Sequence, residues 1–145
     1  MDYIKVVNNQ FQLNTANTSY VMHNEGGFLC HTYYGKRLPD CDHLYMAKRP
    51  WFTCDFNSDI TENLPTLNTA VLEYPAFGDG GINTPALEVL NTDGSNFADL
   101  RVADYVIHEG KPLIEGLPAS YSEEGDKVKT LEVKLKDAVT NVEVS

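Results

Sequence analysis

The stretch TLEVKLK, residues 130–136, decides the fold class, because its side chains alternate between apolar and charged. An extended strand points successive side chains to opposite faces of a sheet, so this period is typical of a strand with one buried face. Leu131, Val133 and Leu135 share the face that we expect to be buried. Because antiparallel sheets commonly pack one face on a core and leave the other in water, we predict a half-buried antiparallel strand.

A hairpin is predicted upstream of this strand, in PALEVLNTDGSNFADLRV, residues 85–102. Apolar and polar residues alternate on both sides of TDGS, residues 92–95. An Asp-Gly step between two such segments is a strong hairpin signal. The apolar run at residues 105–107 indicates a strand that continues after this hairpin.

Three more strands are predicted near the N-terminus, in residues 11–36. Residues 14–18 and the sequence NEGG at residues 24–27 separate these strands. Turn signals about every 8–12 residues are typical of a sandwich of two sheets. We therefore predict that residues 1–145 form one all-β domain, a mostly antiparallel β-sandwich.

The C-terminal stretch DAVTNVEVS continues the alternation through Val142 and Val144 to the final residue. An unpaired apolar edge invites association, so a finished domain rarely stops on such a pattern. Either this strand closes the sheet, or the sequence is cut from a longer protein. We favour the second interpretation, and we expect the sandwich to be truncated.

Residues 39–63 differ from the rest of the chain, because they are aromatic, rich in cysteine and poorly periodic. A connection of about 25 residues without regular structure is unusually long and is often functional. After it, Leu64, Leu67 and Val71 have helical spacing, which predicts at most one or two helical turns. The segment combines carboxylates with Trp51, the only tryptophan. Aromatic faces and acids suit sugar recognition, although a lone tryptophan is more often a core or interface anchor.

The charge and the cysteines of the chain limit its partners and its compartment. Eleven basic and 21 acidic residues give a net charge of −10. Such a surface repels phosphate backbones and anionic lipids, so we expect no nucleic-acid partner and no membrane partner. Cys30, Cys41 and Cys54 are odd in number and irregularly spaced, which favours free thiols over disulfides or a zinc site. With no signal-peptide pattern at the N-terminus, we expect a cytoplasmic protein.

The chain contains no recognisable catalytic motif. The stretch EYPAFGDGGINTPALEV, residues 73–89, places its glycines before an alternating segment, which favours a tight turn over a ligand-binding loop. His23, His31, His43 and His108 are scattered, and we interpret each of them as a structural or surface residue. We therefore predict no catalytic residue, no metal site and no cofactor in this chain.

The order of several motifs identifies a family resemblance. TSYVM, YYGK, KRPWF, EYPAFG, TPALEV, GKPLIEGLPASY and TLEVKLKD follow one another in this order. On these motifs, the chain resembles the N-terminal domain of microbial α-galactosidases of glycoside hydrolase family 36 over its whole length. Two departures are YYGK, where the family more often has Tyr-Trp-Gly-Lys, and LPASY, where Leu-Pro-Ala-Thr-Tyr is common.

The resemblance implies a longer enzyme. In that family an N-terminal β-sandwich precedes a TIM-type barrel and a small β domain, and two aspartates of the barrel act in a retaining mechanism. The barrel is absent from this sequence, so no aspartate here inherits a catalytic role, and the 145 residues alone are expected to be inactive. The resemblance implies that the parent enzyme hydrolyses terminal α-linked galactose from oligosaccharides such as melibiose and raffinose, without a cofactor.

The resemblance also implies candidate sugar contacts. In tetrameric members the long loop of this domain reaches the active site of a neighbouring subunit, where an aspartate and an arginine shape the sugar pocket. Arg49 in KRPWF matches the arginine, but Lys48 stands where the aspartate is expected, and Ile60 replaces a later arginine. We therefore name Arg49, Trp51 and Asp55 as candidate substrate-binding residues, and we expect a homotetramer.

Two other functions remain open at this point. The first is a free-standing carbohydrate-binding β-sandwich module, and the second is a domain with a purely structural role in assembly. From the family resemblance, we also hypothesise that Glu73 and Tyr74 contact the barrel or a neighbouring subunit.

Overall fold

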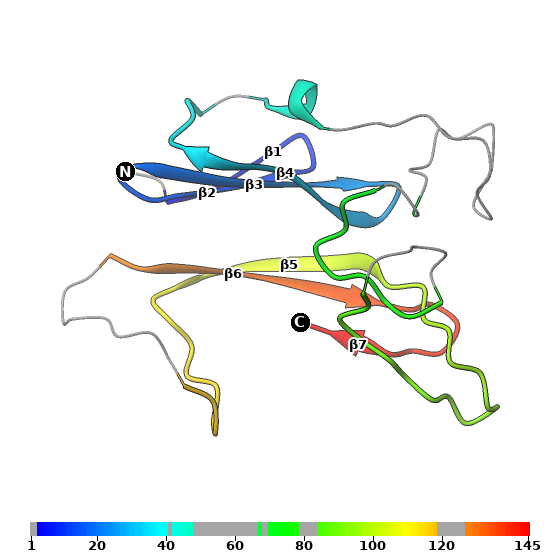
Figure 1. Cartoon of the computed structure of the whole chain (residues 1–145). Coiled ribbons are helices and arrows are strands. Elements are labelled where there is room, and N and C mark those ends of the chain that lie inside the picture. Colours follow the sequence, from blue (N-terminus) through cyan, green and yellow to red (C-terminus); the bar gives the residue numbers. More distant parts are fainter. Residues whose placement is uncertain (1–2, 41, 48–66, 68–69, 79–83, 119–126) are drawn as a thin grey trace.

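The structure, a computed structural model, describes residues 3–40, 42–47, 67, 70–78, 84–118 and 127–145. Two antiparallel sheets dominate this part of the chain (Figure 1). The first sheet contains, in chain order, β1 (Ile4–Val7), β2 (Gln10–Asn14), β3 (Thr18–Glu25) and β4 (Phe28–Lys36). The second sheet contains, in order, β5 (Arg101–Glu109), β6 (Lys129–Lys136) and β7 (Glu143–Val144). A short 3₁₀ helix, η1, spans Leu44–Met46.

The two sheets face each other as the layers of a sandwich (Figure 1). The ring of Phe11 on β2 meets the ring of Tyr105 on β5 edge-to-face, with 5.1 Å between the ring centroids. Elsewhere β1 lies against β6, and β4 lies against β5. The predicted fold class, all-β with mostly antiparallel sheets, is therefore confirmed.

The strand that decided the fold class behaves as its alternation predicts. Leu135 is 6% exposed and belongs to a core cluster with Ala98 and Leu100, and Val133 packs against the same cluster. Lys134, between them, is exposed. At the C-terminus Val144 pairs with Leu135, so the alternation of the last residues becomes β7, the third strand of the second sheet.

A second core cluster lies beside the first sheet, where residues 70–73 run along β4. Leu72 forms an antiparallel bridge with Cys30, and the amide of His31 donates to the carbonyl of Val71. Phe28, Cys30, Leu67 and Ala70 form the buried cluster at this contact. The residues that lead into EYPAFG therefore lie along β4 through an isolated bridge, in agreement with its interpretation as packing rather than as a ligand-binding loop.

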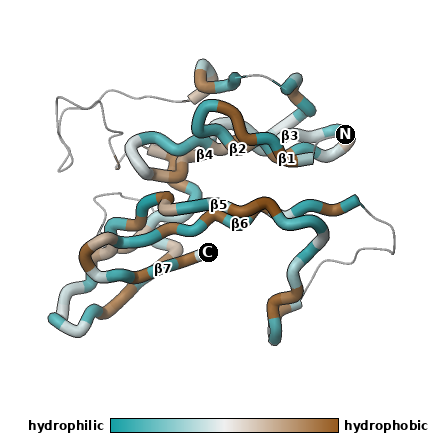
Figure 2. Tube along the Cα trace, turned by 180° about the vertical axis from the view of Figure 1, so that it is seen from behind, coloured by the Kyte–Doolittle hydropathy of each residue, from teal (hydrophilic) through white to brown (hydrophobic). Residues whose placement is uncertain are grey.

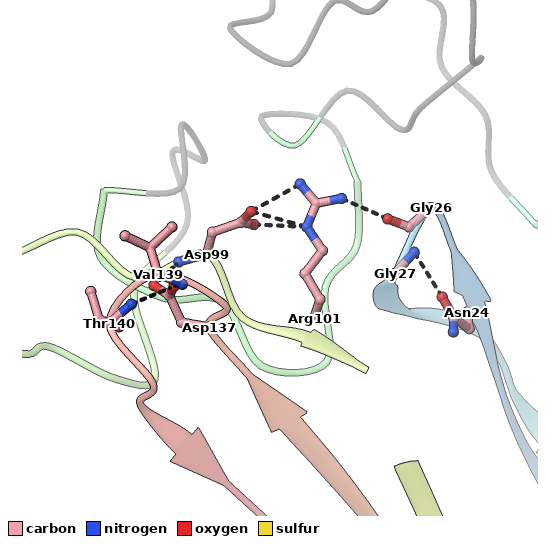
Figure 3. Close-up of polar contacts among 8 residues, drawn as sticks. All are labelled: Asn24, Gly26, Gly27, Asp99, Arg101, Asp137, Val139 and Thr140. Carbon is pink, nitrogen blue, oxygen red and sulfur yellow. Dashed lines mark hydrogen bonds and ion pairs between the residues drawn. The ribbon is translucent and has the colours of Figure 1, made fainter. Parts of the chain in front are cut away.

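Arg101, at the start of β5, joins the two sheets (Figure 3). Its guanidinium donates to the carboxylate of Asp99 at 3.0 Å and to the carbonyl of Gly26 at 2.7 Å, and it lies 4.1 Å from the centre of the Phe28 ring. Gly27, with φ of +94°, packs directly against this side chain, and a Cβ there would lie 2.8 Å from Arg101 Cδ. The β3–β4 turn therefore requires glycine at this position.

Asp137 closes the turn between β6 and β7 from inside the protein (Figure 3). The residue is 1% exposed, and its carboxylate accepts hydrogen bonds from the amides of Val139, Thr140 and Asp99 at 2.7, 3.1 and 3.0 Å. Burial alone would raise the pKa of this carboxyl, but the amide donors outweigh burial and hold the pKa below its usual range. Asp137 is therefore a structural carboxylate that ties residue 99 to the β6–β7 turn.

The predicted hairpin in residues 85–102 is wrong in its strands. The turn exists at residues 91–94, where the amide of Gly94 donates to the carbonyl of Asn91, and Gly94 has φ of +85°. The flanking segments do not form a ladder, and Leu87 instead makes an isolated parallel bridge with Ala76. Leu87, Val89 and Leu100 still pack on the core, so their apolar pattern reports burial without strand pairing.

Other predictions about local structure have mixed outcomes. The three N-terminal strands are confirmed as β2, β3 and β4, whereas β1, only four residues long, was not predicted. The helical turns predicted around Leu64 to Val71 fall mostly outside the described residues. Within the described part of the chain, no helix is long and apolar enough to cross a membrane.

Candidate functional site

The candidate substrate-binding residues Arg49, Trp51 and Asp55 lie outside the described residues. The structure does describe the beginning of the same segment, residues 38–40 and 42–47, which we call the loop root. In Figure 1 the loop root lies on the side of the first sheet that faces away from the second sheet. The contact between the loop root and this outer face is the candidate site, because it holds the last described residues before the candidate substrate-binding residues in the sequence.

A row of buried polar side chains forms the outer face of the first sheet beneath the loop root. Since Phe11 faces the second sheet, alternation along β2 turns Gln10, Gln12 and Asn14 outward, and Ser19 of β3 pairs with Asn14. These four residues, the polar bed, are 3%, 5%, 6% and 0% exposed. Buried polar groups need hydrogen-bond partners, so this face is built to be covered by other polar groups.

Three residues of the polar bed, Gln10, Gln12 and Ser19, bind the backbone of the loop root. Gln12 Nε2 donates to the carbonyls of Leu38 and Pro39, at 3.5 and 3.4 Å. Gln10 uses both ends of its amide: Oε1 accepts from the His43 amide at 2.9 Å, and Nε2 donates to Asp42 Oδ1 at 2.7 Å. Ser19 Oγ accepts from the Leu38 amide at 2.9 Å. These are directional bonds to groups at both ends of the loop root, and they fix its path across the sheet.

The turn at residues 42–46 is held in place and presents an exposed aromatic ring. Asp42 Oδ1 also accepts from the Leu44 amide at 2.8 Å, and this bond, followed by that from Gln10, holds the pKa of Asp42 below its usual range. The His43 side chain is 1% exposed, and its Nε2 donates to the Pro39 carbonyl at 2.9 Å. The neighbouring Tyr45 is 76% exposed. The buried histidine therefore anchors the turn, as its structural interpretation predicts.

One donor of the polar bed lacks a partner among the described residues. Asn14 Oδ1 accepts from Ser19 Oγ at 2.6 Å and from Gln12 Nε2 at 3.1 Å, whereas Asn14 Nδ2 has no hydrogen-bond partner in the described part of the chain. Buried amides of this kind usually bind an ordered water. The remainder of the bed is satisfied, which makes the register of the loop root specific.

A second polar cluster lies on the inner face of the first sheet and includes Glu73. The Glu73 carboxylate accepts from Tyr20 Oη at 2.5 Å and from His31 Nδ1 at 3.0 Å. The rings of Tyr20 and His31 meet edge-to-face at 5.1 Å, and the Tyr34 ring lies 5.8 Å from Tyr20. Burial, and next the hydrogen bond to Glu73, raises the pKa of Tyr20, so this phenol stays protonated as a donor. We call Tyr20, His31, Tyr34 and Glu73 the inner cluster.

The described residues present little reactive chemistry. Burial raises the pKa of the Cys30 thiol to about 12, so it stays a protonated core residue. No group of three or more His, Cys, Asp or Glu among the described residues could hold a metal ion. A cavity of about 10 Å³ beside Leu29 and Leu72 is lined mainly by apolar side chains. This volume is enough for one water molecule and too small for a sugar.

Comparisons with known proteins agree with the order of motifs in the sequence. The model of the glycosyl hydrolase family 36 N-terminal domain matches residues 27–145. The α-galactosidase AgaA of Geobacillus stearothermophilus is 36% identical over 137 residues, which is 94% of this chain. The α-galactosidase Mel36A of Lactobacillus acidophilus is 34% identical over 140 residues, also 94% of this chain.

Solved structures give the same relationship in three dimensions. The crystal structure of AgaA in complex with raffinose superposes with a TM-score of 0.80, at 36% identity, over 92% of this chain and 19% of that chain. The galactosidase domain of the α-galactosidase–sucrose kinase AgaSK gives a TM-score of 0.83, at 31% identity, over 97% of this chain and 20% of that chain. The present chain therefore spans about a fifth of the length of these relatives, 19% in the case of AgaA.

Proposed function

The chain belongs to the N-terminal domain family of glycoside hydrolase family 36, and on this premise we propose that it is the scaffold and assembly domain of a longer, retaining α-galactosidase. The parent enzyme would hydrolyse terminal α-linked galactose from oligosaccharides such as melibiose and raffinose. The observation that carries the proposal is the alignment with AgaA, which runs through 94% of this chain at 36% identity. Crystal structures of AgaA contain raffinose or stachyose, which supports the proposed substrate class.

The proposed division of labour follows from the chemistry of the reaction. A retaining glycosidase needs two carboxylic acids, one as nucleophile and one as acid and base, and it needs no cofactor. We place both carboxylates in the part of the parent enzyme that lies beyond this chain. The 145 residues would then contribute assembly, with a homotetramer as the expected state and the cytoplasm as the expected compartment.

The loop root gives this domain a second proposed role at the active site. Residues 48–63 follow directly from the turn that Gln10 and His43 hold against the sheet. In the proposed tetramer they carry Arg49, Trp51 and Asp55 to the sugar pocket of a neighbouring subunit. The hydrogen-bonded root supports this role, because a loop that contributes to a partner's pocket must leave its own domain along a defined path.

Activity of the full-length protein tests the proposal. We expect hydrolysis of a nitrophenyl α-galactoside by the full-length enzyme and none by residues 1–145. Trp51→Ala and Arg49→Ala should raise KM for raffinose by about tenfold, as expected for a lost sugar contact of 1–2 kcal/mol, while the oligomer survives on light scattering. Unchanged kinetics in both variants would reject the role of the loop, and turnover by residues 1–145 would reject the scaffold assignment.

A further inference from the structure

Two consecutive residues of β3 hold two segments that lie far apart in the sequence. Ser19 Oγ accepts from the amide of Leu38, at the start of the loop root, at 2.9 Å. Tyr20 Oη donates to Glu73 Oε2 at 2.5 Å. Because successive side chains of a strand point to opposite faces of the sheet, Ser19 acts on the outer face and Tyr20 acts on the inner face. We call Ser19, Tyr20 and Glu73 the clamp.

The segment that ends in Glu73 runs along β4, an outer strand of the first sheet in the described part of the chain. The amide of His31 donates to the carbonyl of Val71 at 2.7 Å, and the amide of Glu73 donates to the carbonyl of Leu29 at 3.0 Å. Seen from behind in Figure 2, the loop root lies on the outer side of the first sheet, whereas the chain after residue 70 leads from the first sheet toward the second. The two segments held by the clamp therefore lie on different sides of one sheet.

The carboxylate of Glu73 reaches across two strands from this position. It accepts from His31 Nδ1 on β4 at 3.0 Å and from Tyr20 Oη on β3. The Glu73 side chain is 19% exposed, so water competes little for these bonds. Hydrogen bonds to an ionised acceptor are roughly twice as strong as bonds between neutral groups. Glu73 is therefore the main polar attachment of residues 70–73 to the inner face of the sheet.

Apolar burial holds the same segment independently of the clamp. Leu67 and Ala70 are 3% and 8% exposed, and they pack with Phe28 and Cys30. This cluster remains when the hydroxyl of Tyr20 is removed. Loss of the hydroxyl should therefore shift residues 70–73 locally, while the domain stays folded.

We propose that Tyr20 and Glu73 are positioning residues for the reaction of the parent enzyme, because the clamp holds both ends of the connection on which Arg49 and Trp51 lie in the sequence. The inference rests on the proposed function, in which these two residues contact the sugar. A connection whose two ends are fixed on one strand has fewer conformations than a connection fixed at one end. Groups that bind a substrate lose affinity when they are displaced by as little as about 1 Å.

Kinetics of the full-length enzyme test this proposal. Tyr20→Phe keeps the ring, with its contacts to His31 and Tyr34, and removes only the hydroxyl. We expect KM for raffinose to rise by about three- to tenfold while kcat stays within about twofold, since a displaced sugar contact weakens ground-state and transition-state binding alike. Tyr105→Phe, on the second sheet, is the matched control and should leave both constants within about twofold of the wild type. An unchanged KM in Tyr20→Phe, or a fall in kcat without a rise in KM, would overturn the proposal.

A double-mutant cycle assigns the effect to the hydrogen bond itself. Glu73→Leu removes the acceptor and should raise KM at least as much as Tyr20→Phe does. When Tyr20→Phe is added to Glu73→Leu, KM should change by less than about twofold, because the bond is already absent. Fully additive effects of the two replacements would overturn the role of the pair.

Hydrogen exchange with mass spectrometry measures the clamp without any substrate. In full-length Tyr20→Phe, we expect a peptide of residues 70–75 to exchange about tenfold faster than in the wild type, because a hydrogen bond to a charged group shifts a local opening equilibrium by about this factor or more. A peptide that contains Leu38, which Ser19 holds, should change by less than about twofold. Equal exchange of residues 70–75 in the two proteins would overturn the proposal.

The two measurements separate this inference from the proposed function. A full-length protein that hydrolyses no α-galactoside would reject the proposed enzyme, and the exchange of residues 70–75 would then decide by itself whether the clamp holds this segment. An active enzyme whose KM is unchanged in Tyr20→Phe would reject the positioning role alone.

Discussion

The outer face of the first sheet and the outer strand of the second sheet, β5, differ in both composition and burial. The polar bed is made of amides and hydroxyls, yet it is almost completely buried, because the loop root covers it with matching hydrogen-bond partners. The middle of β5 is made of apolar side chains, yet it is exposed. Composition and burial are thus inverted between the two regions.

The two regions differ in how strongly they specify the segment that lies against them. A polar face under a hydrogen-bonded cover specifies one path for that cover, since each displaced bond leaves a buried group unsatisfied. An apolar edge attracts any segment that buries area, and it specifies its occupant only weakly. The loop root is therefore positioned by its hydrogen bonds, whereas the exposed apolar middle of β5 is not fixed in this way among the described residues.

The largest effect is expected from breaking the covered face. Gln10→Leu leaves the His43 amide and the Asp42 carboxylate without their shared partner, so the free energy of unfolding should fall by about 2–3 kcal/mol. Urea unfolding of the wild-type protein and the variant measures the change. Leu90→Ser is the control on the exposed surface, and it should change the free energy by no more than about 0.5 kcal/mol. Equal losses in both variants would contradict the distinction between the two regions.

A second effect is expected at Asp137, whose pKa is lowered in the folded protein. A carboxyl with a depressed folded pKa adds stability above its unfolded pKa of about 3.9, and this stability is lost as the pH falls from that value through the folded pKa. Asp137→Asn removes the titration, so its stability should depend less on pH below about pH 4 than that of the wild type. Acid titrations that remain parallel for the two proteins would refute the assignment.

A smaller effect is expected at the open edge. Ile107→Lys puts a charge at a residue of β5 that is already 37% exposed, so in residues 1–145 it should change the free energy of unfolding by less than about 1 kcal/mol. It should also reduce self-association, because a charged residue on an outer strand opposes pairing with another chain. Light scattering of the two proteins at increasing concentration provides the measurement. Stronger association in the variant would count against an adhesive edge.

The smallest effect is expected from an exposed ion pair of the second sheet. Lys136 Nζ lies 2.7 Å from Glu143 Oε1, and both side chains are partly exposed. Lys136→Met should change the free energy of unfolding by about 0.5 kcal/mol or less, since water and salt screen such pairs. Thermal unfolding at low and high salt provides the test. A loss comparable to that of Gln10→Leu would show that surface charge, rather than the polar bed, dominates this domain.

Alternation in the sequence predicted the sheets well, and it predicted their pairing less well. TLEVKLK lies in β6 with Leu135 buried. An alternation with a period of two puts all the apolar side chains of an extended strand on one face, which can then be buried. The same pattern at residues 85–102 did not become a hairpin, although Leu87 and Leu100 still reached the core. A period of two reports which side chains are buried. It does not report which backbone lies alongside.

The candidate site was predictable only in part. The irregular composition of residues 39–63 singled out the segment that begins at the loop root, and its role in sugar binding stays a prediction. Gln10, Gln12 and Asn14 gave no signal, because polar residues at alternate strand positions normally predict a face in water. Ser19 likewise carries no mark of burial in the sequence. Only the tertiary structure shows that the face is covered, through the hydrogen bonds of Gln10, Gln12 and Ser19 to the loop root.

The sequence by itself determined the all-β class, the positions of the main strands and, through the order of its motifs, the family. These properties depend on local periodicity and on residue identity, both of which can be read along the chain. Only the tertiary structure decided which faces are covered, how residues 70–73 join β4, and that β5 is the outer strand of its sheet among the described residues. Burial depends on contacts between residues far apart in the sequence, and no local pattern contains the identity of the partner.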